Sequence, residues 1–273
     1  MRWSVFLRNP LGVAGLLVLL VFTVGSFAAP WLAPHDPAAV NLRAMQLPPG
    51  GEHLLGTDDL GRDVLSRLLF AGRISLSLAL LVTGFAVVIG CTLGALAGFS
   101  GGWTERLVSL AADALLSIPA LGLAMVAGAI LRPNVLTLAI VLALVAWPDL
   151  ARITRSQVLS LREQTFTEAA VAVGGSPARV LFRHVMPNTV APLIVAATLL
   201  SANVLLVESA LSFLGYGMRP PTPSWGGMLN EAQAFYRQSP WLAVFPGLAI
   251  TFTVAAINFL GDAMRSASGG RGA

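Results

Sequence analysis

Residues 165–188 are TFTEAAVAVGGSPARVLFRHVMPN, a stretch with polar residues and glycines between two long apolar runs. Thr165 and Glu168 have the S/T-x-x-E spacing of a capping box, in which Thr165 caps a first short helix and Glu168 reaches back to its start. Gly174 and Gly175 should end that helix, because glycine adopts the left-handed conformation of a C-terminal cap. The stretch therefore predicts a short helix followed by a tight bend.

A second short helix should follow the bend. Ser176 and Pro177 suit its N-cap and its first turn, and Pro187 should end it. Arg179 and Arg183 are one turn apart, so both can lie on one face. Two capped helices between apolar runs are suited to be held by another protein, although the capping signals alone describe an ordinary structured loop equally well.

The predicted helix pair resembles the EAA loop of ABC-importer permeases, in which Glu-Ala-Ala is followed by three residues, Gly, nine residues and Ile-x-Leu-Pro. The residues that match this spacing are Glu168, Ala169, Ala170, Gly174 and Pro187. In that family the loop docks in a groove of the ATPase subunit and transmits its motion. The resemblance implies an ATPase-coupling loop over residues 160–187, to which Arg179, Arg183 and His184 also contribute.

The end of this loop resembles one branch of the family. His184 and Met186 replace the Ile and Leu of the general pattern. The segment 183–188, RHVMPN, is instead similar to the R-H-x-x-P-N of the oligopeptide/dipeptide (and nickel) transporters, in their second-permease (C-type) branch. Val171 replaces an Arg that is often present in the family, so we expect one polar contact to be missing there.

The composition predicts a membrane protein with several spans. The chain is 56% hydrophobic and 11% charged, whereas soluble domains carry about 25% charged residues. All 17 basic residues are Arg, and a Walker A loop needs a Lys on the phosphates. This chain therefore cannot hold a standard ATP site. The net charge of +4 comes from arginines scattered at span ends, which argues against nucleic acid as a partner.

Cysteine and histidine usage gives no sign of a disulfide or a metal. Cys91 is the single cysteine, so no internal disulfide can form. His35, His53 and His184 are far apart in the sequence, and no ligand spacing indicates a structural metal.

The apolar runs predict an all-α membrane protein, because each is close to or above the roughly 20 residues that cross a bilayer. The expected spans cover residues 11–33, 74–99, 107–131, 135–159, 189–214 and 241–260. Six spans place both termini on one side of the membrane. In the second span, glycines at near four-residue spacing offer a face for close helix packing; they are Gly84, Gly90, Gly94 and Gly98.

Three further segments resemble the same family. The segment beginning HLLGTDDLGRDVLSR at His53 is similar to H-x-L-G-T-D-x-x-G-R-D-V-x-S-R, and its residues 62–70 predict a short amphipathic helix that leads into the second span. The segment 214–229 is similar to L-G-x-G-x-x-P-P-x-P-S-W-G-x-M-L. Within it, Ser224 should cap a helix from Trp225 to about Tyr236. The ending from Gly261 resembles G-D-x-x-R.

Three acidic residues, Asp113, Asp149 and Glu208, lie inside or at the edge of the predicted spans. Ionisable groups in a span are costly and are functional candidates. Arg152 follows Asp149 by three residues, so we expect a local ion pair there. Asp113 and Glu208 are then the candidates for the transport pathway or for a polar contact between helices. Such acids also suit an ion-coupled secondary transporter, but the chain lacks the internal repeat common in that class.

The resemblance implies the type I ABC-importer transmembrane fold. It divides the chain into 1–73, a span plus extracytoplasmic segment, 74–262, the permease core, and 263–273, a cytoplasmic tail. It also implies a bacterial cytoplasmic membrane protein with cytoplasmic termini and no bond chemistry of its own. The implied partners are a second permease subunit, two ATPase subunits that hold ATP and Mg²⁺, an extracytoplasmic solute-binding protein and membrane lipid. Di- and oligopeptides are the expected cargo, with nickel chelates, opines or other small solutes as alternatives.

Overall fold

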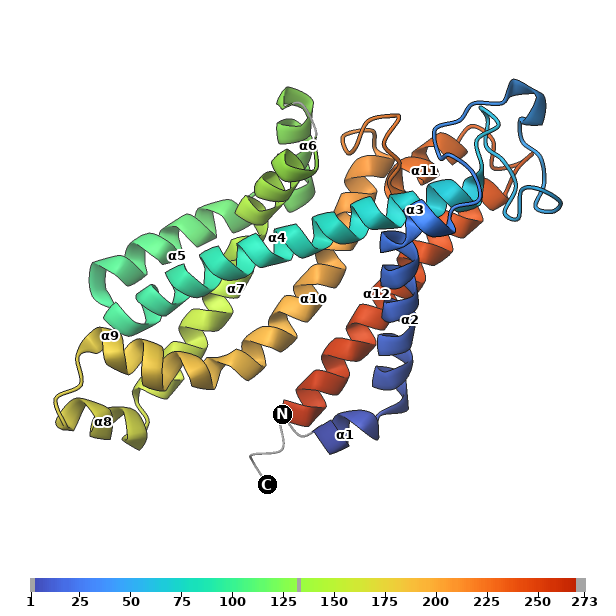
Figure 1. Ribbon diagram of the computed structural model, residues 1–273. Helices are drawn as coiled ribbons and strands as arrows, with labels where there is room; N and C mark the ends of the chain where they lie inside the picture. Colours follow the sequence, from blue (N-terminus) through green and yellow to red (C-terminus); the bar gives the residue numbers. More distant parts are fainter. Residues whose placement is uncertain (1–2, 132–133, 269–273) are drawn as a thin grey trace.

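The computed structural model describes residues 3–131 and 134–268, and most of these residues are helical (Figure 1). In these ranges the only β pairing is two isolated bridges, Gly50 with His53 and Thr57 with Asp63. The helices are α1 Trp3–Leu7, α2 Pro10–Phe27, α3 Ala29–Leu32, η1 Leu42–Ala44, α4 Val64–Ser100, α5 Gly102–Leu116, α6 Ala120–Ile130, α7 Val135–Arg162, α8 Thr165–Ala172, α9 Pro177–Val180, η2 Leu181–Val185, α10 Met186–Phe213, α11 Trp225–Ala232 and α12 Trp241–Ser268.

Five of the described helical segments are long and apolar enough to cross a membrane: α2, α4, α7, α12 and the continuous run 177–213. The pair α5 and α6 passes the same test only when taken together, across a bend of 80°. Six spans result when this pair counts as one, which agrees with the predicted number. The all-α membrane fold is therefore confirmed.

The predicted short helix over residues 62–70 is wrong as a separate element. Asp63 caps a single helix α4, its carboxylate accepting the amide hydrogen of Ser66 at 2.8 Å, and the helix continues for 37 residues to Ser100. No proline interrupts it, and Gly72 stays helical. At 1.5 Å per residue its length is about 55 Å, well beyond a hydrocarbon core of about 30 Å.

The third predicted span, 107–131, is not a straight helix. It breaks after Leu116, and the chain resumes as α6 at Ala120. Pro119 causes the break, because proline disfavours a helical conformation in the residue before it and lacks the amide hydrogen that a continuing helix needs. The result is a bent span.

The ends of the other predicted spans also need correction. The first span ends at Phe27 and is followed by the short α3. The last span, α12, continues past the predicted end at residue 260 to Ser268, so most of the predicted tail 263–273 is helical. Residues 269–273 of that tail lie outside the described residues.

Helices α4 and α7 pack closely along the predicted glycine face. A Cβ atom on Gly94 would lie 2.4 Å from the carbonyl oxygen of Ala151, and one on Gly90 would lie 2.7 Å from the Cβ of Leu150. Gly98 meets Arg155 in the same way, whereas Gly84 faces open space. Three of the four glycines therefore permit the contact, as small residues do between membrane helices.

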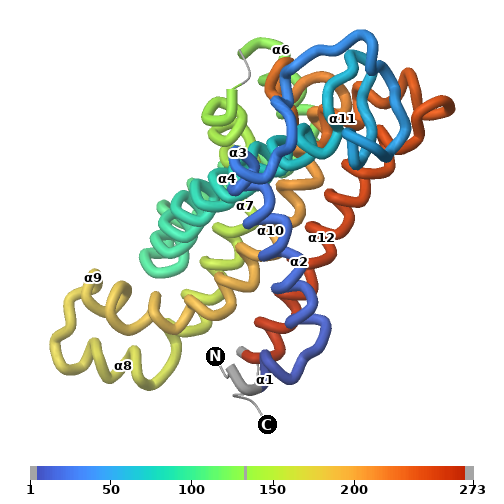
Figure 2. The backbone as a smooth tube through the Cα atoms, turned by 45° about the vertical axis from the view of Figure 1, so that its right-hand side comes forward, coloured from blue at the N-terminus to red at the C-terminus, as the bar shows by residue number. Residues whose placement is uncertain are grey.

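The two ends of the molecule differ in content (Figure 2). Helix α8 lies at one end, together with α1 and the end of α12. The segment between α3 and α4 lies at the other end, together with α11. Trp225 of α11 is buried, with its indole nitrogen donating to the carbonyl of Leu68 at 3.1 Å. This tryptophan anchors α11 to α4 and the central core.

Candidate functional site

The start of α8 differs from the predicted capping box. Gln164, in an extended conformation, is the N-cap residue, and its side chain makes no capping bond. Thr165 is already the first helical residue, so the assignment of Thr165 as the cap is wrong. Only Glu163 and Gln164 separate α7 from α8, and Thr167 fastens the two helices by donating to the carbonyl of Leu161 at 2.8 Å. The carboxylate of Glu168 has no hydrogen bond within the described ranges and is exposed.

The end of α8 follows the prediction. Gly174 has a φ of +84°, its amide bonds to the carbonyl of Val171 at 2.9 Å, and the amide of Gly175 bonds to the carbonyl of Ala170 at 3.1 Å. This pair of bonds is a Schellman motif. A Cβ on Gly175 would lie 2.5 Å from the Ala170 oxygen. Both glycines are thus required by the tight turn.

The second helix begins as predicted but does not end at Pro187. The hydroxyl of Ser176 accepts the amide hydrogen of Arg179 at 3.4 Å. The helix then passes through the π-helical turn η2 into α10, with the amide of Met186 bonding to the carbonyl of Leu181. Pro187 lies in the first turn of α10. The wider π turn accommodates it, because proline has no amide hydrogen to offer and needs room behind it.

Residues 165–185, from the start of α8 to the end of η2, are called the α8–η2 unit below. A small hydrophobic cluster holds this unit against α4 and α7. Its buried members are Ala95, Val158, Ala170, Val180, Leu181 and Val185. Three segments of the chain therefore meet beneath α8. Because the turn is held by hydrogen bonds and the underside is packed, a force on α8 would move α4, α7 and α10 with it.

The outer side of the α8–η2 unit is exposed and partly apolar. Val173 is 87% exposed and Phe182 is 67% exposed. A groove of about 450 Å³ lies beside α8, between the end of α4 and the start of α9. Its lining includes Phe99, Arg162 and Glu168. Large exposed apolar side chains beside a groove are typical of a surface that binds another protein.

The predicted loop residues divide between these two sides. Ala170 packs inward, and His184 is half-buried. The exposed ones are Glu168, Ala169, Gly174, Arg179, Arg183 and Pro187. Among the described residues, the side chains of Arg179 and Arg183 form no ion pair, so they are available to a partner.

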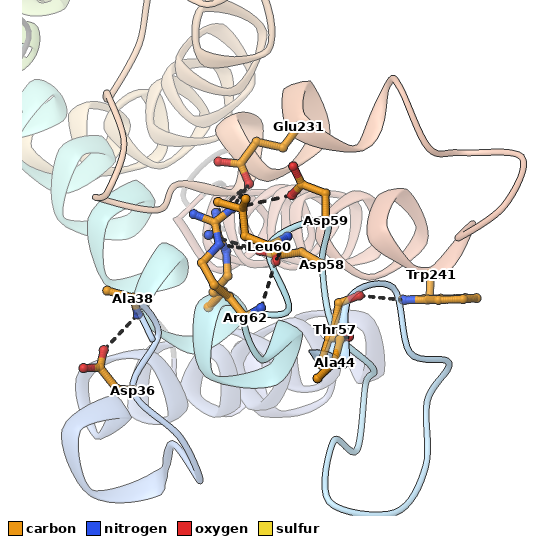
Figure 3. A network of polar contacts seen from close by, with 11 residues as sticks. Asp36, Ala38, Ala44, Thr57, Asp58, Asp59, Leu60, Arg62, Glu231 and Trp241 are labelled. Atoms are coloured by element: carbon orange, nitrogen blue, oxygen red, sulfur yellow. Dashed lines mark hydrogen bonds and ion pairs between the residues drawn. The ribbon is translucent and has the colours of Figure 1, made fainter. Parts of the chain in front are cut away.

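At the opposite end, a buried cluster of charges joins the segment before α4 to α11 (Figure 3). The guanidinium of Arg62 donates to Asp58 at 2.7 Å and to Glu231 at 3.0 Å. Arg67 donates to the same oxygen of Glu231 at 2.7 Å and lies 3.2 Å from Asp58. The exposed fractions of the two arginine side chains are 7% and 3%.

This ion-pair cluster was not predicted as a unit. Its members come from the two outer segments that resemble the permease family, and Glu231 lies 169 residues from Arg62. The polar residues themselves are visible in the sequence, but only the fold brings them together. Removing one partner would leave a buried charge uncompensated, which costs about 3–5 kcal/mol.

Two of the three histidines meet near this cluster, although they are far apart in the sequence. The rings of His35 and His53 lie 4.8 Å apart between centroids. The Nδ1 of His53 is 2.9 Å from Asp63, and the Nε2 of His35 is 3.1 Å from the carbonyl of Glu52. These contacts tie the loop to the cap of α4, since Asp63 is also the N-cap residue.

Comparison with known proteins matches this architecture to one family. Residues 90–271 match the family model of the binding-protein-dependent transport system inner membrane component. Residues 1–49 match the N-terminal TM domain of oligopeptide transport permease C. The chain belongs to this permease family.

Several curated relatives align with nearly the whole length of this permease. It is 38% identical to the dipeptide transport system permease protein DppC of Alkalihalophilus pseudofirmus over 260 residues, covering 95% of this chain and 86% of the relative. It is 39% identical to the di/tripeptide transport system permease protein DppC of Pseudomonas aeruginosa over 271 residues, covering 97% and 89%. The corresponding protein of Haemophilus influenzae is 36% identical over 271 residues, covering 97% and 92%. The resemblance to the C-type branch is therefore confirmed.

The three acids of the permease spans have different surroundings. Asp113 of α5 accepts a hydrogen bond from Arg152 of α7 at 2.5 Å. Arg152 is thus paired across helices, and the expected ion pair between Arg152 and Asp149 is wrong. Glu208 is 1% exposed and accepts a hydrogen bond from Ser212 at 2.8 Å, one turn along α10. Asp149 is exposed on α7.

Proposed function

We propose that this permease is one of two permease subunits of an ATP-driven importer of short peptides. The observation that carries the proposal is the α8–η2 unit, which is packed beneath and exposed above. The named relatives support peptide as the cargo, since they are described as dipeptide or di/tripeptide permeases.

The proposal assigns each end of the molecule to one side of the bacterial cytoplasmic membrane. Helix α8 and both termini face the cytoplasm, where the ATPase subunits are. The segment between α3 and α4, with α11, faces outward and receives the solute-binding protein. The proposed partners are a second homologous permease, two ATPase subunits with ATP and Mg²⁺, this binding protein and membrane lipid; nucleic acid is not among them.

The proposed coupling is mechanical. An ATPase subunit grips the exposed side of α8, with Glu168, Arg179 and Arg183 as its polar contacts and Val173 as an apolar one. When the ATPase pair closes on ATP, α8 moves as a unit with η2. The continuous run 177–213 then carries that movement into the span that includes Glu208. Hydrolysis resets the arrangement, and the cargo path opens alternately to each side.

The test uses the full complex reconstituted in lipid vesicles with its binding protein. Glu168→Ala and Gly174→Asp should still insert and assemble but lose most peptide-dependent ATP hydrolysis. Glu168→Ala removes an exposed carboxylate, whereas Gly174→Asp strains the turn that ends α8, where φ is +84°, and so misplaces the exposed side of the loop. Asp262→Ala is the matched control, since Asp262 is also an exposed acid, near the end of α12, but lies outside both the loop 160–187 and the groove.

Two outcomes would overturn the proposal. Normal peptide uptake by a correctly inserted Gly174→Asp complex would remove the coupling role of the loop. Uptake that follows a proton gradient without ATP would favour an ion-coupled transporter. A panel of di- and tripeptides beside nickel chelates tests the cargo class separately, because coupling to ATP is measured whichever ligand is transported.

A further inference from the structure

The bend of the third span creates a cavity between helices. Helices α5 and α6 meet at an angle of 80°, and Pro119 and Ala120 at this bend form one wall. Helices α7 and α10 form the rest, and the volume is about 220 Å³. The lining is apolar except for Asp149 and Asn203. Two polar groups therefore face an otherwise apolar space.

Asp149 lies midway along helix α7, directly after the apolar first half of the helix. It follows Val135, the start of α7, by 14 residues and precedes Arg162, the end, by 13, or about 20 Å from each end at 1.5 Å per residue. Within the described residues its carboxylate has no hydrogen bond or ion pair. Arg152, the nearest cation in sequence, is held by Asp113.

Such a carboxylate is expensive unless it meets water or a cation. Acids within a membrane-spanning helix normally face a cavity or the interior of a bundle, and they mark the path of a substrate or an ion. Asp149 stabilises no contact within this chain, so its presence is not explained by the fold. Asn203 is also exposed, and its amide forms no hydrogen bond in the described part of the chain.

We propose that Asp149 and Asn203 form a subsite for the amino-terminal end of a peptide in transit. The carboxylate of Asp149 pairs with the protonated α-amino group, and the amide of Asn203 bonds to the first peptide unit. This subsite rests on the proposed function, because it takes the cargo to be a peptide.

The size and chemistry of the cavity suit this role. A volume of about 220 Å³ lies below the range of about 300–1,000 Å³ that encloses a whole drug-sized ligand. The cavity thus fits one end of a peptide, and the remainder extends along the path. A carboxylate and an ammonium form a charge-assisted hydrogen bond, which is stronger than a neutral one. The apolar walls accept the first side chain without selecting its identity.

The experiment compares complexes that carry Asp149→Asn, Asp149→Glu or no change. Each complex receives the same binding protein, loaded with tri-alanine or with N-acetyl-tri-alanine, and loading is checked beforehand. The ratio of the uptake rate of the variant to that of the unchanged permease then reports only the step that the permease performs. Asp262→Asn is the control, because Asp262 is an exposed acid near the end of a different span.

Asp149→Asn should slow uptake of tri-alanine by about tenfold, since losing a charge-assisted hydrogen bond weakens binding by at least that factor. Uptake of N-acetyl-tri-alanine should change little, and Asp149→Glu should restore most of the tri-alanine rate. An equal loss for both peptides, or no loss for either, would overturn the subsite. The subsite would also be overturned if the Asp149→Asn variant no longer co-purified with the second permease subunit. That result would indicate that Asp149 forms an ion pair with that subunit rather than with a peptide.

Failure of the proposed function is a distinguishable result. In that case the unchanged complex would transport neither peptide, whatever residue stands at position 149.

Discussion

The two ends of this permease are held together in different ways. At the α11 end, Arg62 and Arg67 are buried and paired with nearby Asp58 and with Glu231, which is more than 160 residues away in the sequence. At the α8 end, the hydrogen bonds that shape the turn are local, and the underlying cluster is small and apolar. Arg62 and Arg67 at the α11 end are buried, whereas Glu168, Arg179 and Arg183 at the α8 end are exposed.

Because of this difference, substitutions at the two ends should affect different properties of the permease, namely stability at one end and the proposed coupling at the other. Buried ion pairs tolerate no loss of a partner, so the α11 end should act as a fixed anchor. Exposed, unpaired side chains cost the fold little when they are replaced. Substitutions of the buried charges at the α11 end should therefore reduce stability, whereas substitutions of exposed residues at the α8 end should reduce the proposed coupling and leave stability nearly unchanged.

The largest expected effect on stability comes from the ion-pair cluster. Arg67→Met should destabilise the permease by about 3–5 kcal/mol, because it leaves Glu231 and Asp58 with one arginine between them. The thermal melting point of the purified complex, followed by size-exclusion chromatography, measures this. Arg73→Met is the matched control, since Arg73 lies on the same helix but is exposed. Equal melting points for the two variants would contradict the anchor role.

The next effect concerns the helix contact that connects the two ends. Gly94→Leu should destabilise the permease by roughly 1–3 kcal/mol or more, because its side chain would meet the backbone of Ala151. Gly84→Leu adds the same side chain in open space on the same helix. The yield of folded protein after solubilisation should fall for the first variant only. A similar fall for both would mean that lipid contact, rather than packing against α7, limits this face.

The sequence predicted the elements of this permease better than their junctions. Apolar runs and glycine spacing identified the spans and the glycine face of α4, because length and small-residue periodicity are local properties; the packing partner of that face, α7, could not be predicted. Pro187 was expected to end a helix, yet the preceding π turn absorbs it. Pro119 was not expected to bend a span, although it does. A proline marks a possible irregularity, and the packing around it decides which one forms.

In the candidate site, too, local features could be predicted and contacts between distant segments could not. The glycines at 174 and 175 could be placed from sequence, because a left-handed turn has a strong residue preference. The partners of Arg152 and Arg62 could not be predicted in this way, because Asp113 and Glu231 are 39 and 169 residues away from them in the sequence. The three-residue spacing of Asp149 and Arg152 predicted an ion pair between them, but Arg152 pairs with Asp113, and Asp149 instead lines the cavity.

A smaller effect is expected at the turn that ends α8. Gly174→Ala should cost about 1–2 kcal/mol, because a φ of +84° is unfavourable for a residue with a Cβ atom. Gly247→Ala makes the same change inside helix α12 in open space, where alanine is favoured over glycine by up to about 1 kcal/mol. Melting points should thus move in opposite directions. A rise for both variants would show that the turn relaxes easily and that the α8 unit is less rigid than its hydrogen bonds indicate.

The smallest effect compares one helix cap from each end. Ser224 is buried and accepts the amide hydrogen of Gly227 at 3.1 Å, whereas Ser176 is exposed and accepts that of Arg179 at 3.4 Å. Ser224→Ala should cost about 1 kcal/mol, within the usual range for a lost cap. Ser176→Ala should cost less, because water can replace the hydroxyl at an exposed helix start. Melting points of the two single variants and the double variant measure this, and the two costs should add because the sites are far apart. A larger loss for Ser176→Ala would reverse the comparison, since it would make the α8 end the more constrained of the two.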